Sequence, residues 1–161
     1  MAKPIPDGYH SLTPSLIVSD GKKAVEFYKK AFGAKDHGVM MCPDTGRFMH
    51  AELEIDGSRF MLGGEMQEMG CFSPLHYKGT PVSMYLYVKD SDKAFDQAVK
   101  AGATSIMPVG DMFWGDRCGT VKDPFGHQWS IGTHKEDLTP QQIQEGAKKW
   151  MEQAKKKAVA A

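Results

Sequence analysis

The chain has 161 residues, of which 41% are hydrophobic and 25% are charged. This composition is typical of a folded globular protein and excludes a disordered or coiled-coil chain, and the length suits one domain. Lysine plus arginine and aspartate plus glutamate each number 20, so no net field attracts nucleic acid or an anionic membrane.

The amino-terminal residues and the cysteines indicate where the protein works. Residues 1–8 contain no apolar signal segment, and no later stretch approaches about eighteen consecutive apolar residues. Cys42, Cys71 and Cys118 are isolated and form no C-x-x-C pair, so neither a disulfide framework nor a structural zinc site is predicted. We therefore expect a soluble, cytoplasmic protein that contacts neither membranes nor nucleic acid.

The chain contains an internal repeat. Residues 16–20 (LIVSD) and residues 86–90 (LYVKD) are similar strand-and-turn segments, 70 residues apart. Each ends in an Asp, Asp20 or Asp90, that is suited to cap a helix, and apolar residues at helical spacing follow. Gly33 or Gly102 is placed to end the helix in the left-handed conformation. The apolar helix positions are Ala24, Phe27, Tyr28 and Ala31 in the first copy and Ala94, Phe95, Ala98 and Ala101 in the second.

After each helix the hydrophobic pattern changes to period two, which predicts strands. The predicted strands cover roughly 35–43, 47–56 and 58–64 in the first copy and roughly 104–109, 116–122 and 127–133 in the second. Each copy is thus a β-α-β-β-β module of an α+β protein. We place the first module at about 9–64, a connector at 65–80 and the second module at about 81–134.

A final helix is predicted over about 140–157. Thr139 is suited to cap it, Pro140 to occupy its first turn and Gln142 to complete a capping box. One apolar stripe on this helix needs a partner surface, on its own subunit or on a neighbouring one. The stripe consists of Ile143, Ala147, Trp150, Met151 and Ala154.

Five short segments carry a resemblance to a known family. They are YHSLTP at 9–14, AVEFYKKAFGA at 24–34, HAEL at 50–53, FWGDR at 113–117 and DPFGHQW at 123–129, followed by Thr133-His134. With two βαβββ modules, the chain resembles the vicinal oxygen chelate superfamily, which includes glyoxalase I, bleomycin-resistance proteins and extradiol dioxygenases, and is most similar to its PhnB-like branch. The resemblance implies that the whole chain, 1–161, is one domain of this type. It also implies curved mixed sheets, each lining a cavity on one face, and commonly a homodimer.

The resemblance also implies where a metal would bind. Metal-using relatives place His, Gln or Glu near the start of each module's first strand and in the middle of its last strand. Those positions correspond here to Thr13, Met61, Ser83 and Ser130. Hydroxyls and a thioether are poor ligands for a hard or borderline divalent cation, so we expect no metal and no cofactor.

Alternation along the strands predicts which side chains face the cavity. In the strand near 83–87, Ser83, Tyr85 and Tyr87 lie opposite an aliphatic row, and in the last strand Gln128, Ser130 and Gly132 turn inward. In the strand near 48–56, the face opposite the apolar set carries Phe48, His50, Glu52 and Glu54.

Four residues suit a planar or anionic ligand: Tyr85 and Trp114 offer flat surfaces, Arg117 a permanent cation and Gln128 an amide. The competing interpretations are hydrophobic filling for Trp114 and a structural ion pair for Arg117 with Asp116. We expect His127 to point outward and His134, at the exit to the tail, to be a surface or packing residue.

Two functional hypotheses remain. In the first, a metal-independent homodimer binds a small organic molecule through His50, Glu52, Tyr85, Trp114, Arg117, Gln128 and Ser130. In the second, His50 and Glu52 form a relocated site for a divalent ion in a lyase, isomerase or dioxygenase. Two residues do not complete a coordination sphere, so the favoured interpretation of His50 and Glu52 is a hydrogen-bonded pair that lines the cavity or an interface.

Overall fold

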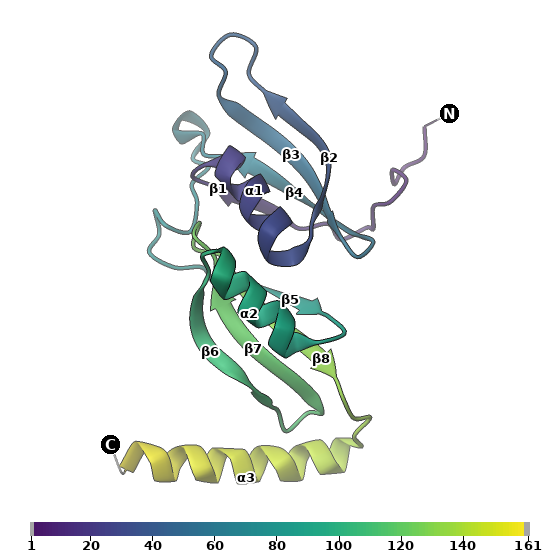
Figure 1. Cartoon of the computed structure of the whole chain (residues 1–161), viewed down its shortest axis with the longest axis vertical. Coiled ribbons are helices and arrows are strands. Elements are labelled where there is room, and N and C mark those ends of the chain that lie inside the picture. Colours follow the sequence, from purple (N-terminus) through teal and green to yellow (C-terminus); the bar gives the residue numbers. More distant parts are fainter. Residues whose placement is uncertain (1, 160–161) are drawn as a thin grey trace.

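Two copies of one β-α-β-β-β unit form the body of the protein, as the sequence repeat predicts (Figure 1). The computed structural model describes residues 2–159, except for the side chains of residues 154 and 157–159. Module 1 consists of β1 (Ser15–Val18), α1 (Gly21–Phe32), β2 (Lys35–Met41), β3 (Phe48–Ile55) and β4 (Ser58–Gly64). Module 2 consists of β5 (Ser83–Tyr87), α2 (Ser91–Ala101), β6 (Thr104–Asp111), β7 (Asp116–Lys122) and β8 (Gln128–His134).

Each module forms its own four-stranded mixed sheet, and the two sheets do not close into a barrel. The strand orders are β1-β4-β3-β2 and β5-β8-β7-β6, with the first pair of each sheet parallel and the others antiparallel. Ser15 pairs with Met61 in module 1, and Tyr85 pairs with Ser130 in module 2. The repeat in the sequence is therefore also a repeat in strand register.

The helix ends form as predicted. Asp20 and Asp90 each accept a hydrogen bond from the backbone N–H three residues further on, at 3.1 and 3.0 Å. Gly33 and Gly102 end the helices with φ of 67° and 119°. A side chain would be strained in that left-handed region, so glycine is required at both ends.

Helices α1 and α2 lie next to each other at the centre of the molecule, each covering one face of its own sheet (Figure 1). The buried apolar side chains of both modules form one core. Within it the Tyr28 hydroxyl donates to Asp123 Oδ2 at 2.7 Å, and Trp129 Nε1 donates to the same oxygen at 3.0 Å. The opposite face of each sheet carries no helix, and we call it the open face.

Two side chains lie differently from the sequence-based expectation. Phe48 was expected opposite the apolar set, but it is buried in the core, because the β2–β3 register shifts between Met40 and Met41 and changes the alternation by one residue. His127 was expected to point outward. It is 8% exposed, and its Nε2 lies 2.9 Å from the carbonyl oxygen of Ile17, so it links the modules.

Helix α3 (Pro140–Val159) begins with the predicted capping box. The Thr139 backbone N–H donates to Gln142 Oε1 at 2.8 Å, and the Gln142 N–H donates to Thr139 Oγ1 at 3.3 Å. Within residues 2–159, neither α3 nor another helix is long and apolar enough to cross a membrane.

Helix α3 lies across the far end of module 2, away from module 1 (Figure 1). The rings of Phe113 and Trp150 approach to 6.0 Å between centroids, so part of the apolar stripe docks on its own subunit. Trp150 and Met151 remain 52% and 55% exposed, and the side chain of Ala154, on the same predicted stripe, lies outside the described residues.

Candidate functional site

A buried carboxylate organises the open face of module 2. Asp116, at the start of β7, is 3% exposed, and its Oδ2 accepts three hydrogen bonds. The Tyr85 and Tyr87 hydroxyls donate at 2.8 and 3.1 Å, and Trp114 Nε1 donates at 3.1 Å. Tyr85 and Tyr87 are two residues apart on β5 and therefore project from one face. Strand order brings them to a carboxylate about 30 residues away in the chain.

The second carboxylate oxygen of Asp116 pairs with His134. His134 Nδ1 lies 2.8 Å from Asp116 Oδ1, and His134 Nε2 lies 3.0 Å from Asp137 Oδ1. Hydrogen bonds to Asp116 and Asp137 raise the pKa of His134. Burial alone raises the pKa of Asp116, but the hydrogen bonds from His134, Tyr85 and Tyr87 outweigh burial and lower this pKa overall. Asp116 is therefore ionised at neutral pH.

The two phenols act only as hydrogen-bond donors to Asp116. Burial and its hydrogen bond to Asp116 raise the pKa of Tyr85, and a separate hydrogen bond to Asp116 raises the pKa of Tyr87. Gly132 on β8 faces the Tyr85 ring, and a Cβ there would lie 2.6 Å from the Tyr85 hydroxyl. The absence of a side chain at Gly132 thus permits the hydroxyl to reach the carboxylate.

The open face of module 2 collects four of the predicted ligand-binding residues. Tyr85 and Trp114 meet at Asp116, and Ser130 pairs with Tyr85 across β5 and β8. The Ser130 hydroxyl lies 3.1 Å from Thr120 Oγ1 on β7. Gln128 is two residues from Ser130 on the same face and is half-buried.

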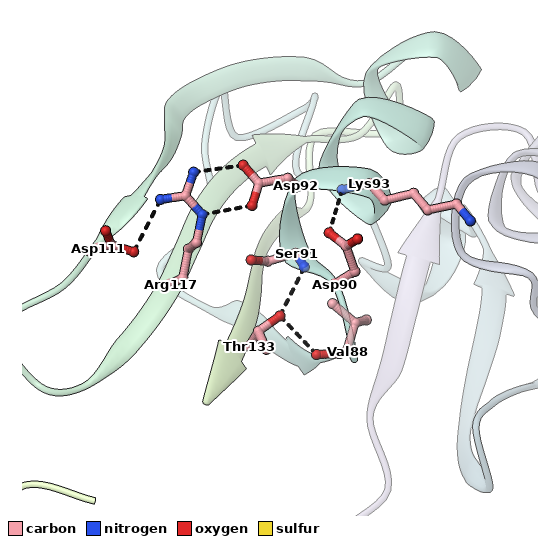
Figure 2. A network of polar contacts seen from close by, with 8 residues as sticks. All are labelled: Val88, Asp90, Ser91, Asp92, Lys93, Asp111, Arg117 and Thr133. Carbon is pink, nitrogen blue, oxygen red and sulfur yellow. Dashed lines mark hydrogen bonds and ion pairs between the residues drawn. The ribbon is translucent and has the colours of Figure 1, made fainter. Parts of the chain in front are cut away.

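Arg117 lies on the opposite, helix-covered face of this sheet (Figure 2). Its Nε and Nη2 donate to the two carboxylate oxygens of Asp92 at 2.6 and 2.7 Å, and its Nη1 donates to Asp111 at 3.1 Å. These hydrogen bonds raise the pKa of Arg117. The structure thus pairs Arg117 with Asp92 at the start of α2 and does not bring it to Tyr85.

The open face of module 1 is charged. His50 Nε2 and Glu52 Oε1 on β3 are 3.9 Å apart, too far for a direct hydrogen bond, and each side chain is about one-third exposed. His37 Nε2 on β2 lies 2.9 Å from Glu54 Oε2. His50 and Glu52 therefore face the same side, but on a different sheet from the other predicted site residues.

Arg59 on β4 adds a positive charge to this face. Its guanidinium carbon lies 4.9 Å from the centroid of the Tyr9 ring, and its nitrogens lie 3.8 Å from Glu52 and 3.9 Å from Glu54. Arg59 Nε and the Tyr9 hydroxyl are buried without a hydrogen-bond partner among residues 2–159. Burial and the nearby Glu52 carboxylate raise the pKa of Tyr9.

A cavity of about 530 Å³ lies where the two modules meet. Arg59 and Phe60 of β4 line it from module 1, and Tyr85 and Tyr87 of β5 line it from module 2. The cavity is in the usual size range of small-molecule sites. It brings Tyr85 and Tyr87 together with Arg59 and apolar side chains of module 1, whereas the other predicted ligand-binding residues lie outside its lining.

The donors available to a divalent metal do not fit such an ion. The positions implied by metal-using relatives are Thr13, Met61, Ser83 and Ser130. Within the described part of the chain, no three His, Cys, Asp or Glu side chains gather closely enough to hold a metal. Near the predicted pair His50 and Glu52, the Arg59 guanidinium lies beside the carboxylates and would repel a cation.

Sequence reasoning missed Asp116, Tyr87 and His134 as members of one cluster. The face on which Asp116 lies could have been predicted from Val121, an apolar residue of β7 that is fully buried in the structure. Alternation from Val121 puts Arg117 on the helix-covered face and Asp116 on the open face. For Arg59 and Tyr9 no local signal existed, since their contact joins segments 50 residues apart.

Two βαβββ modules, each with one helix-covered and one open face, are the fold of one protein superfamily. The chain belongs to this glyoxalase/bleomycin resistance protein/dioxygenase superfamily. The model of the glyoxalase/bleomycin resistance protein/dioxygenase superfamily matches residues 9–131. An uncharacterised protein of Mycobacterium bovis is 41% identical over 137 residues, which are 83% of this chain and 90% of the relative.

Solved structures agree on the fold. The X-ray structure of a gene product from Arabidopsis thaliana has a TM-score of 0.58 and 28% identity, over 76% of this chain and 98% of that chain. A PhnB protein of Bacillus cereus has a TM-score of 0.59 and 18% identity, over 77% of this chain and 99% of that chain. Because the identity is only 18%, the comparison with the PhnB protein shows a shared fold and nothing about function.

Proposed function

We propose that this protein binds a small organic molecule in the cavity between its modules and does so without a divalent metal. The observation that carries the proposal is the fixed aromatic wall of that cavity. Tyr85 and Tyr87 line the cavity, and their hydroxyls are held by the buried carboxylate of Asp116. Side chains fixed before a ligand arrives lose little entropy on binding, so they favour affinity.

The remaining polar groups suit orientation of a ligand. Ser130 and Gln128 lie on the same open face as the aromatic wall, and His50 and Glu52 lie on the open face of module 1. We propose these four residues, with Tyr85 and Trp114, as the ligand-binding set. Tyr85 is the member of the set that lines the cavity, and the other five lie on the open faces beside it. Arg117 is the exception, because its guanidinium is paired with Asp92 on the other face.

We further propose that the protein is a cytoplasmic homodimer. Each sheet has an open face with exposed apolar side chains, among them Met40 in module 1 and Tyr87 in module 2, and α3 exposes Trp150 and Met151. Apolar surface of this kind favours a partner. Light scattering should report twice the chain mass, and a monomer throughout the micromolar range would contradict the dimer.

The binding proposal is tested with the best hit of a metabolite screen and isothermal titration calorimetry. Tyr87→Leu should weaken that ligand roughly three- to tenfold, because an aromatic contact contributes about 0.5–1.5 kcal/mol beyond its buried area. Tyr77→Leu is the matched control, since Tyr77 is 64% exposed but lies in the connector. Equal affinity in the Tyr87→Leu variant and the wild type would place the ligand elsewhere.

Metal content decides between this proposal and a divalent-metal lyase, isomerase or dioxygenase centred on His50 and Glu52. Protein purified without chelators should contain far less than one equivalent of zinc, nickel, iron or manganese per chain by elemental analysis. His10→Ala, which changes an exposed histidine outside the pair, is the control for His50→Ala. A stoichiometric metal that His50→Ala removes and His10→Ala retains would overturn the metal-independent proposal.

A further inference from the structure

Tyr85 and Tyr87 are oriented opposite to ordinary surface tyrosines. A surface tyrosine usually buries its ring and leaves its hydroxyl in water. Here the hydroxyls point inward to Asp116, while the residues are 43% and 59% exposed. The ring centroids are 4.8 Å apart and the planes are inclined by 44°. Two rings fixed by hydrogen bonds therefore present aromatic surface at the cavity.

The charge behind these rings is negative. Asp116 and Asp137 flank His134, so even a protonated imidazole leaves one negative charge in excess. Both phenols use their protons on Asp116, which leaves their oxygen lone pairs and ring faces as the groups available to a ligand. The face of an aromatic ring is the negative part of its quadrupole. The ring pair and the carboxylate behind it thus favour positive charge.

The nearby arginines do not reverse this preference. Arg117 lies on the far face of the sheet, hydrogen-bonded to Asp92 and Asp111 (Figure 2). Arg59 on the facing wall lies beside the carboxylates of Glu52 and Glu54, at 3.8 and 3.9 Å. Two carboxylates offset one guanidinium, so this wall does not attract an anion either.

We infer that Tyr85 and Tyr87 form a subsite for an organic cation, whose ammonium or delocalised cationic group rests on the two ring faces. The inference rests on the proposed binding function and adds the charge of the ligand to it. Cations are attracted to the faces of tyrosine and tryptophan within about 6 Å of the ring centroid. The sequence alone predicts a planar or anionic ligand, and the anionic alternative depends on Arg117.

The test uses three probes that share a benzyl or phenyl group and differ in charge. Benzyltrimethylammonium, benzyl alcohol and benzoate are titrated into the full-length wild-type chain, with binding followed by protein NMR at constant ionic strength. We expect the cation to bind roughly five- to thirtyfold more tightly than the alcohol, the range for a cation–aromatic contact. Benzoate should bind most weakly of the three.

Three variants locate the effect. Tyr87→Leu should abolish the preference for the cation, and Asp116→Asn should reduce it, because the side chain keeps its size but loses its charge. Tyr77→Leu should leave the preference unchanged, since Tyr77 lies in the connector. Tyr87→Leu keeps three of the four hydrogen bonds to Asp116, so the test stands even if Asp116→Asn fails to fold.

The outcomes separate this inference from the proposed function. If benzoate or benzyl alcohol binds as tightly as the cation and Tyr87→Leu still weakens binding, the cation subsite is wrong but small-molecule binding at the rings stands. If no probe perturbs resonances of the aromatic wall and the metabolite screen gives no ligand, both are wrong.

Discussion

The open faces of the two modules belong to sheets of the same strand order but differ in chemistry. In module 1, the charged side chains of His50, Glu52 and Arg59 approach one another only to 3.8–3.9 Å, although His37 and Glu54 on the same face lie 2.9 Å apart. In module 2, the corresponding face is aromatic, and Asp116 takes four contacts of 2.8–3.1 Å. The helix-covered faces pack one shared core, which restricts their residues. The open faces carry no such restriction, and their residues differ between the modules.

One position shows how small a backbone change separates the modules. Phe48 and Asp116 are both the first residues of the third strand of their module, since His50 pairs with Gly63 as Cys118 pairs with Gly132. The register shift beside Phe48 turns its ring into the core. Asp116 keeps the regular alternation and stays on the open face. A single irregularity thus decides whether that position serves the core or the site.

The largest effect is expected for Asp116→Ala. This change leaves the donors of Tyr85, Tyr87 and Trp114 without their shared acceptor and should cost about 3 kcal/mol of unfolding free energy. Glu52→Ala, on the open face of module 1, should cost less than about 1 kcal/mol because its contacts are long and solvated. Chemical denaturation measures both. Equal losses would mean that the two faces are equally organised.

The next largest effect is expected for alanine in place of Gly132 on β8, compared with alanine in place of Gly63 at the equivalent position on β4. At Gly132 a Cβ would meet the Tyr85 hydroxyl at 2.6 Å and the ring at 2.9 Å, and that ring is held by Asp116. At Gly63 it would meet only the mobile end of Ile17 at 2.9 Å. Gly132→Ala should therefore cost about 1–3 kcal/mol and change the near-ultraviolet circular dichroism. Gly63→Ala should cost clearly less; the reverse order would contradict the fixed position of Tyr85.

A pH-dependent effect is expected from His134. Its pKa in the folded protein lies above the ordinary value of 6.5 because of Asp116 and Asp137. The stabilisation of the folded state by protonated His134 is therefore complete below about pH 6 and is lost as the pH rises through the raised pKa. The difference in Tm between wild type and His134→Gln should shrink between pH 6 and pH 8, roughly. His50→Gln in module 1 is the control, and a Tm difference for His134→Gln that is constant with pH would contradict the pairing.

The smallest effect is expected for Arg117→Ala. The Arg117–Asp92 pair is partly exposed, so its loss should lower Tm by only a few degrees. Because the guanidinium lies on the helix-covered face, affinity for any ligand of the cavity should not change. Isothermal titration calorimetry with the best hit of the metabolite screen checks this. A loss of affinity of roughly tenfold or more would show that Arg117 contributes to ligand binding.

Most of the fold was predictable because its signals are local. Capping aspartates, helix-ending glycines and period-two strands depend on residues close in sequence, and Asp90, Gly102 and the Thr139–Gln142 box behave as expected. The site was only partly predictable. Alternation placed Tyr85 and Ser130 together, but the contacts that fix the aromatic wall involve strands far apart in the chain.

Hydrophobic periodicity was enough to predict the duplicated β-α-β-β-β pattern, the α+β class and the side of each regular strand that enters the core. Tertiary structure decided the chemistry of the site. Only the strand order β5-β8-β7 brings Tyr85 to Asp116, and only the packing of α2 gives Arg117 its partner Asp92. The physical reason is that a side chain's charge partners are set by sheet order and helix packing, which no local period encodes.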